Sequence, residues 1–84
     1  MSERAVVRGE WLRRCEGFAV RSHAGRLGVV ETVLFEEDTR PAALSVRRSR
    51  FARGVRIIDA ADVEEIDTRA RRVAVRSDGV EVSF

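Results

Sequence analysis

Two side chains could do nucleophilic or acid–base chemistry near neutral pH, Cys15 and His23, and each is the single residue of its type. A lone imidazole acts as a general base only beside a positioned nucleophile or carboxylate, and the sequence identifies no such partner for His23. Thiolate activation needs a basic neighbour; Arg13 and Arg14 precede Cys15, but no histidine lies near it. We therefore expect an exposed turn histidine, a small buried cysteine and a protein that is not an enzyme, with no catalytic or cofactor-binding residues.

A group of carboxylates in the second half of the chain could offer oxygen ligands to a hard cation. Its members are Asp59, Asp62, Glu64, Glu65 and Asp67. Their spacing lacks the glycine-centred turn of a dedicated calcium loop. A solvated acidic face is the better interpretation, and we predict no metal site.

A run of arginines without acidic residues is the local feature that could indicate nucleic-acid binding. It comprises Arg47, Arg48, Arg50, Arg53 and Arg56, with Phe51 inside it. Arginines bind phosphates, and a phenylalanine can stack on a base. The chain as a whole has a net charge of only +2, however, and acidic residues follow directly downstream. Two interpretations stay open: an RNA-binding loop, and a loop that pairs with the acidic segment of another copy.

The elements that must position these residues belong to one small domain, because 84 residues are too few for two. One cysteine cannot form an internal disulfide, which is typical of a reducing compartment. The longest apolar runs, such as 33–35, have three residues and are far shorter than the roughly 20 residues of a membrane-spanning helix. The first residues mix both charge signs and do not resemble a secretory signal. We expect a cytoplasmic protein without membrane insertion.

The N-terminal residues have helical spacing. Val7, Trp11, Leu12 and Cys15 share one helix face, which predicts a short helix from about 10 to 16 that ends at Gly17. Trp11 and Phe84 lie near the two ends of the chain, where little material is available to bury them. Each is a candidate interface residue or the completion of the core. The short core and these aromatic residues favour a homodimer.

From residue 17 the sequence has β-type alternation. A hairpin over 17–36 turns at His23–Arg26, and its long second strand must bend near Glu31–Thr32, where the apolar positions change face. Further strands are expected around 41–46, 55–57, 63–67, 73–75 and 80–84, with a helical turn at 60–62 and a final hairpin through 77–79. We predict an all-β fold: a small, mainly antiparallel barrel of six or seven strands, closed to remove its edges.

The spacing of glycines and aliphatic residues resembles the PRC-barrel domain. The matching segments are Gly17-Phe18-x-Val20, Gly25-Arg26-Leu27-Gly28-x-Val30-x-x-Val33, Leu44-x-Val46, Val55-x-Ile57, Asp62-Val63-x-x-Ile66-Asp67 and Val73-x-Val75. The lead-in from Trp11 to Gly17 is similar to that of small stand-alone actinobacterial members. The chain departs from the family at His23-Ala24, where an acidic or proline-containing turn is commoner, and at Asp59-Ala60-Ala61, where a proline often stands.

The resemblance implies an arm and short helix over 1–16 followed by a PRC-type barrel over 17–84. In that family the barrel occurs in the H subunit of photosynthetic reaction centres, in a ribosome maturation factor and in archaeal division proteins. These roles share adaptor behaviour and no common chemistry. The resemblance therefore implies a non-catalytic protein–protein interaction module whose partner is unknown, with an RNA-binding or ribosome-associated module using 47–56 as the alternative.

Overall fold

The computed structural model describes residues 14–36 and 41–83, and these residues are all-β. The strands are β1 (Ala19–Ser22), β2 (Gly25–Phe35), β3 (Pro41–Arg47), β4 (Gly54–Asp59), β5 (Val63–Asp67), β6 (Arg72–Val75) and β7 (Val80–Ser83), with the 3₁₀ turn η1 (Ala60–Asp62) between β4 and β5. The predicted all-β class, the strand positions and the helical turn at 60–62 are confirmed. No helix in the described part of the chain has the length and apolar character needed to cross a membrane.

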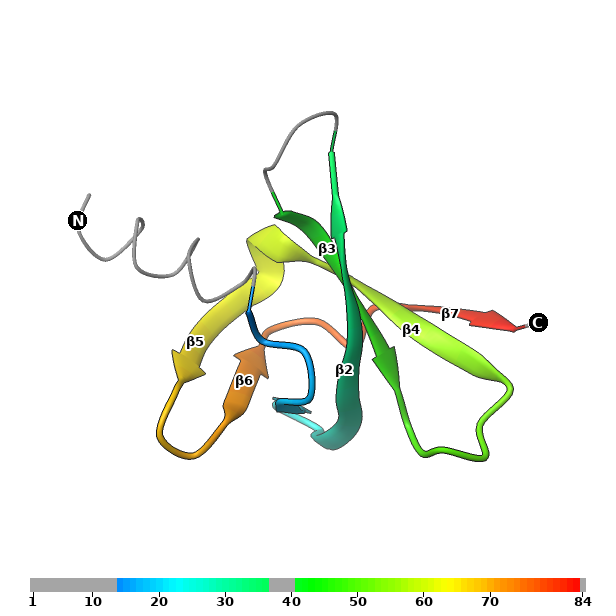
Figure 1. Ribbon diagram of the computed structural model, residues 1–84, viewed down its shortest axis with the longest axis horizontal. Helices are drawn as coiled ribbons and strands as arrows, with labels where there is room; N and C mark the ends of the chain where they lie inside the picture. Colours follow the sequence, from blue (N-terminus) through cyan, green and yellow to red (C-terminus); the bar gives the residue numbers. More distant parts are fainter. Residues whose placement is uncertain (1–13, 37–40, 84) are drawn as a thin grey trace.

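The seven strands form one mixed sheet in the order β5-β6-β1-β2-β3-β4-β7. The β1–β6 pair is parallel, and the other neighbouring strands are antiparallel. In Figure 1, β5 and β6 lie on one side of the long strands β2 and β3, and β4 and β7 lie on the other. The sheet is therefore mainly antiparallel, as predicted.

The bend predicted in the second strand is confirmed. The register between β2 and β3 shifts between Val30 and Thr32, and again between Leu34 and Phe35. An extra residue in one strand reverses the alternation locally, so Val30 and Val33, three residues apart, are both buried. The long strand β2 thereby contributes buried side chains to the core on both sides of its bend.

The sheet is not closed, and the predicted barrel is wrong in this respect. The described residues form no ladder between β5 and β7, which are the two edges of the sheet. The reason lies in the last strand: β6 already has β5 and β1 on its two sides, so β7 pairs with β4 instead. The final hairpin predicted through 77–79 is also wrong, because those residues carry the chain away from β6.

The predicted N-terminal helix falls largely on residues 10–13, which lie outside the described residues, as do Trp11 and Phe84. The remainder of that prediction is wrong, because Arg14–Glu16 form a turn. Phe18 donates its backbone N–H to the Cys15 carbonyl at 3.0 Å, and Gly17, at φ +91°, donates to the Val30 carbonyl at 2.8 Å. These bonds direct the chain into the sheet at Gly17.

One cluster of buried side chains forms the core. It consists of Cys15, Phe18, Val20, Val30, Val33, Leu44, Val46, Ile58, Val63, Val73 and Val75. Every strand except β7 contributes to it. In β4 the residue that belongs to this cluster is Ile58. Of the two residues that the alternation singled out, Val55 is buried outside the cluster and Ile57 is half-buried. The β4–β7 end of the sheet therefore contributes one residue to the cluster.

Candidate functional site

The loop between β3 and β4 presents the most exposed part of the predicted basic run. Arg48, Arg50, Phe51 and Arg53 are all exposed, Phe51 to 85% of its surface. The loop is held by Ser49, whose hydroxyl accepts from the Phe51 N–H at 3.3 Å and whose carbonyl accepts from the Ala52 N–H at 3.1 Å. A serine turn of this kind fixes the backbone locally and leaves the flanking side chains free to point outward. We call these four exposed residues the basic loop.

Two arginines of the predicted run do not belong to this surface. Arg47 forms an ion pair with Glu31 of β2 and donates to the Ala52 carbonyl. The hydrogen bond with Glu31 raises the pKa of the Arg47 guanidinium above its ordinary value. Arg47 therefore ties β3 to β2 and to the base of the loop.

Arg56 has a similar structural role at the edge of the sheet. Its Nη1 donates to the Asp78 carbonyl at 3.0 Å, and its Nη2 lies 3.5 Å from Oε1 of Glu81. These contacts join β4 to β7 and to the segment before it. Of the six predicted binding residues, four thus form the basic loop and two brace the sheet around it.

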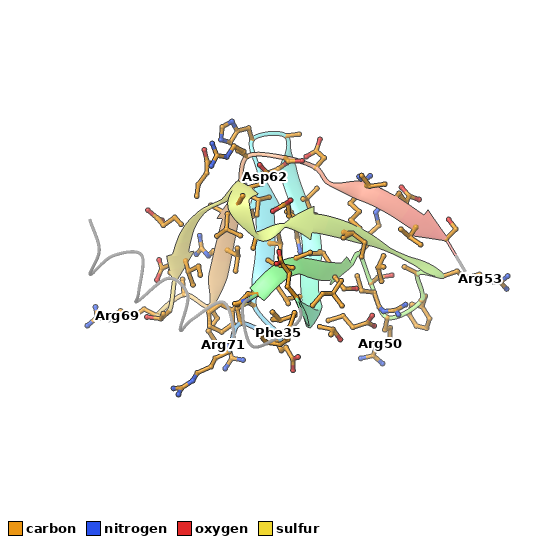
Figure 2. The ribbon with its side chains drawn as sticks, turned by 90° about the horizontal axis from the view of Figure 1, so that it is seen from above. Phe35, Arg50, Arg53, Asp62, Arg69 and Arg71 are labelled. Atoms are coloured by element: carbon orange, nitrogen blue, oxygen red, sulfur yellow. The ribbon has the colours of Figure 1, made fainter. Side chains whose placement is uncertain are left out.

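The arginines of the basic loop have no acidic partner among the residues that the structure describes. Within residues 14–36 and 41–83, no carboxylate forms an ion pair with Arg48, Arg50 or Arg53. The Arg50 guanidinium lies 6.0 Å from the centre of the Phe51 ring, at the outer limit of a cation–π contact. Figure 2 shows Arg50 and Arg53 at one end of the molecule and Arg69 at the other. The loop is therefore a compact cationic surface with an aromatic ring in it.

A pocket of about 220 Å³ adjoins the basic loop. The apolar residues Leu27, Val46 and Val55 contribute to its lining. Its charged lining residues are Arg48, Arg53, Arg56 and Glu81, so positive charge predominates. Pockets for cofactors and drug-sized ligands measure about 300 to 1,000 Å³. The size suits one side chain of a partner better than a cofactor.

No sequence pattern indicated this pocket, because part of its lining comes from β7. Glu81 and Ser83 line the pocket only because β7 pairs with β4, with Glu81 opposite Arg56 and Ser83 opposite Gly54. The residues at 77–79 have the composition of a tight hairpin turn, which misdirected the prediction toward β6. The Arg56–Glu81 pair was the available clue, but opposite charges 25 residues apart are too common to specify a strand pairing.

His23 has the exposed position predicted for it, and the structure adds a partner that the sequence did not identify. Its Nε2 lies 2.9 Å from Oε1 of Glu64 in β5. Both side chains are solvent-exposed. The neighbouring Ser22 hydroxyl accepts from the Ala24 N–H at 3.1 Å, which is an ordinary turn contact. The pair links the β1–β2 turn to the sheet edge.

Cys15 is fully buried in the core, as predicted. Burial raises the pKa of its thiol to about 11. The thiol is therefore protonated at neutral pH and shielded from solvent, which is the opposite of an activated nucleophile.

The acidic cluster consists of residues with local structural contacts. Asp59 caps η1 by accepting from the Ala61 N–H at 2.9 Å, and Asp67 accepts from the Ala70 N–H at 3.0 Å. Asp62 lies 3.6 Å from Nε of Arg76. In the described part of the chain, no three histidine, cysteine or acidic side chains gather as metal ligands would.

Compared with known proteins, this chain matches no family model and no curated protein. The basic loop and its adjoining pocket are the features of this chain from which a function can be inferred.

Proposed function

We propose that the protein is a non-catalytic interaction module, related to the PRC-barrel domain, that binds an acidic protein partner through the basic loop. The observation that carries the proposal is Phe51, 85% exposed and flanked by three exposed arginines at the end of a braced hairpin. Aromatic residues and arginine are the residues most enriched among those that dominate binding energy at protein interfaces. The adjoining pocket gives an anchoring side chain of the partner a place to bury.

The braced hairpin makes this surface suitable for binding. Arg47 holds the base of the loop to β2, so the loop is presented on a rigid scaffold and little further order has to be imposed on it when a partner binds. The unneutralised arginines favour carboxylates, which arginine can bind with two parallel hydrogen bonds. The sequence resemblance to a family of adaptors supports the same function.

The test is capture of a partner from an extract of the source cell, treated with nuclease, on the immobilised protein. Replacing Arg48, Arg50 and Arg53 with serine should reduce the captured partner at least tenfold. The matched control replaces Arg21, Arg69 and Arg72, which are also exposed, with serine. It removes the same amount of charge and should leave capture unchanged. Equal capture by both triple variants would contradict the proposal.

Single-strand RNA is the second candidate, and the exposed Phe51 ring is the observation that favours it. A base can stack on this ring while the arginines bind flanking phosphates. If three arginines contact phosphates, the plot of log Kd against log salt should be steeper by about 2 for the parent than for the serine triple variant. Each contact to a single strand contributes about 0.7 to this slope. Fluorescence anisotropy with a labelled oligonucleotide measures this slope. The RNA hypothesis fails if the serine triple variant and Phe51→Ala keep the parent affinity and slope.

A further inference from the structure

The edge strand β7 is exposed along its length and, within the described residues, pairs on one side only. Within the described residues its partner is β4, and its outer edge faces no other strand. All four of its residues are exposed, with Val80 at 69% and Val82 at 39%. An edge strand presents backbone N–H and C=O groups that can pair with a further strand.

The two faces of β7 differ in chemistry. Glu81 and Ser83 line the pocket beside the basic loop. Val80 and Val82 alternate with them and so point to the other face of the sheet. A strand added to β7 would therefore meet a cationic pocket with one set of its side chains and an apolar stripe with the other.

The opposite edge, β5, has the features that protect natural edge strands from pairing, whereas β7 lacks them. The register of β5 against β6 shifts between Val63 and Glu65, and Glu64 and Glu65 are exposed charges. The β4–β7 ladder runs without a register shift. The one charged residue of β7, Glu81, lies 3.5 Å from Arg56 of β4. Bulges and charged residues are the usual means of blocking an edge.

We propose that β7 receives an additional antiparallel or parallel strand from the partner, an extended segment in which acidic and apolar residues alternate. The acidic side chains lie toward Arg48 and Arg53, and the apolar side chains cover Val80 and Val82. Main-chain hydrogen bonds supply affinity and the alternating side chains supply specificity, as in other strand additions. This inference rests on the proposed function and names the chemistry of the partner.

Charge distinguishes this occupant from a second copy of the chain. Of the three arginines that line the pocket, Arg56 is paired with its one glutamate, Glu81, which leaves Arg48 and Arg53 for a partner. The β7 strand of a second copy offers one carboxylate, Glu81, which is already paired with Arg56. A segment with two or more acidic residues at alternate positions complements the pocket better.

The probe is a labelled heptapeptide, Ser-Val-Glu-Val-Glu-Val-Ser with blocked ends, added to the ¹⁵N-labelled protein. We expect saturable amide shifts in 80–83 and slower hydrogen exchange there. Arg53→Ser should weaken binding at least fivefold and Val80→Ser about threefold. Phe35→Ser, an exposed apolar residue of β2, is the matched control and should bind as the parent does. Replacing both glutamates of the peptide with lysine, or methylating alternate backbone nitrogens, should weaken binding of the peptide at least tenfold.

Three results would overturn the inference. Equal binding of the methylated peptide would show that no backbone pairing occurs, and shifts confined to the basic loop would show that β7 is not the site. A concentration-dependent dimer whose β7 amides are protected without peptide would show that a second copy occupies the edge. If the basic loop still governs partner capture in these cases, the proposed function stands and the strand addition alone is lost. If β7 takes the peptide while capture is insensitive to the loop, the interaction surface is the edge and the basic-loop proposal is lost.

Discussion

Strands β6 and β7 have similar sequences and opposite environments. Each is four residues long and alternates two valines with other residues, Arg-Val-Ala-Val in β6 and Val-Glu-Val-Ser in β7. The valines of β6 are fully buried, whereas those of β7 are 69% and 39% exposed. The difference comes from topology, because β6 is paired on both sides and β7 on one. Alternation thus identifies a strand without indicating whether its apolar face is covered.

The comparison divides the sheet by role. The β5–β6–β1 side supplies much of the buried core and ends in a blocked edge. The β4–β7 side has the basic loop, the pocket and the exposed edge strand. The first side contributes more of the buried core, and the second carries the exposed cationic loop that we propose as the binding surface.

The largest effect is expected where the two sides meet, at Gly28. This residue has φ +149°, and an added Cβ would lie 2.2 Å from the Arg47 carbonyl oxygen. Gly28→Ala should cost about 3 kcal/mol or more through backbone strain and steric overlap. Gly25→Ala is the control: φ is +129° there, but nothing lies within 4 Å of the added Cβ, so about 1 kcal/mol is expected. Urea unfolding measures both.

If the two sides are one cooperative unit, Gly28→Ala lowers the urea midpoint of the whole domain in one transition. Separate transitions for the core and the β4–β7 side would show that the division by role is also a division in folding. Equal destabilisation by the two alanine variants would contradict the close approach of β2 to Arg47.

Cys15 reports on the core side through pH. Its folded pKa, about 11, lies above the ordinary value of about 9, so deprotonation favours the unfolded state. Stability from the buried thiol is fully present below about pH 9 and is lost as the pH rises toward 11, by about 2 to 3 kcal/mol. The chain has no lysine or tyrosine, so Cys15 is the one side chain that titrates in this window.

Urea unfolding at pH 8 and pH 11 tests this, with Cys15→Ala as the control. The variant should be less stable at pH 8 but show no loss of stability between the two pH values. A thiol reagent should also react with native Cys15 only at the rate of unfolding. Rapid reaction at pH 8 would show that the core side is open at this position.

The same substitution made in β6 and in β7 tests directly whether their valines differ in burial in solution. Val73→Ala removes a fully buried side chain and should cost about 2 kcal/mol, whereas Val82→Ala should change stability by less than about 0.5 kcal/mol. Thermal and urea unfolding give both values. A comparable cost at the two sites would mean that the apolar face of β7 is covered in solution.

The smallest effect is expected at His23, which touches the β5 edge from the β1–β2 turn. Its pair with Glu64 is exposed, so His23→Ala should cost less than about 1 kcal/mol. Glu64→Gln should have a similarly small effect, measured by the same unfolding curves. A loss of several kcal/mol would show that this contact is part of the core side.

The candidate site was predictable in part. Clustered arginines around Phe51 identified the loop, because a local excess of one charge is visible in sequence. That Arg47 and Arg56 brace the sheet was not predictable, since an arginine beside a glutamate on another strand looks the same in sequence as a solvent-exposed one. The Glu64 partner of His23 was missed for the same reason, as 41 residues separate them.

The sequence by itself determined the strands, the bend in β2 and the turn at 60–62, because alternation, β-branched residues and turn residues act over a few neighbours. Tertiary structure decided which strands are adjacent. The path of 77–79 to β4 left the sheet open, placed Glu81 in the pocket and exposed the valines of β7. Strand pairing depends on which edges are still free once the rest of the sheet has formed, and no local pattern encodes that choice.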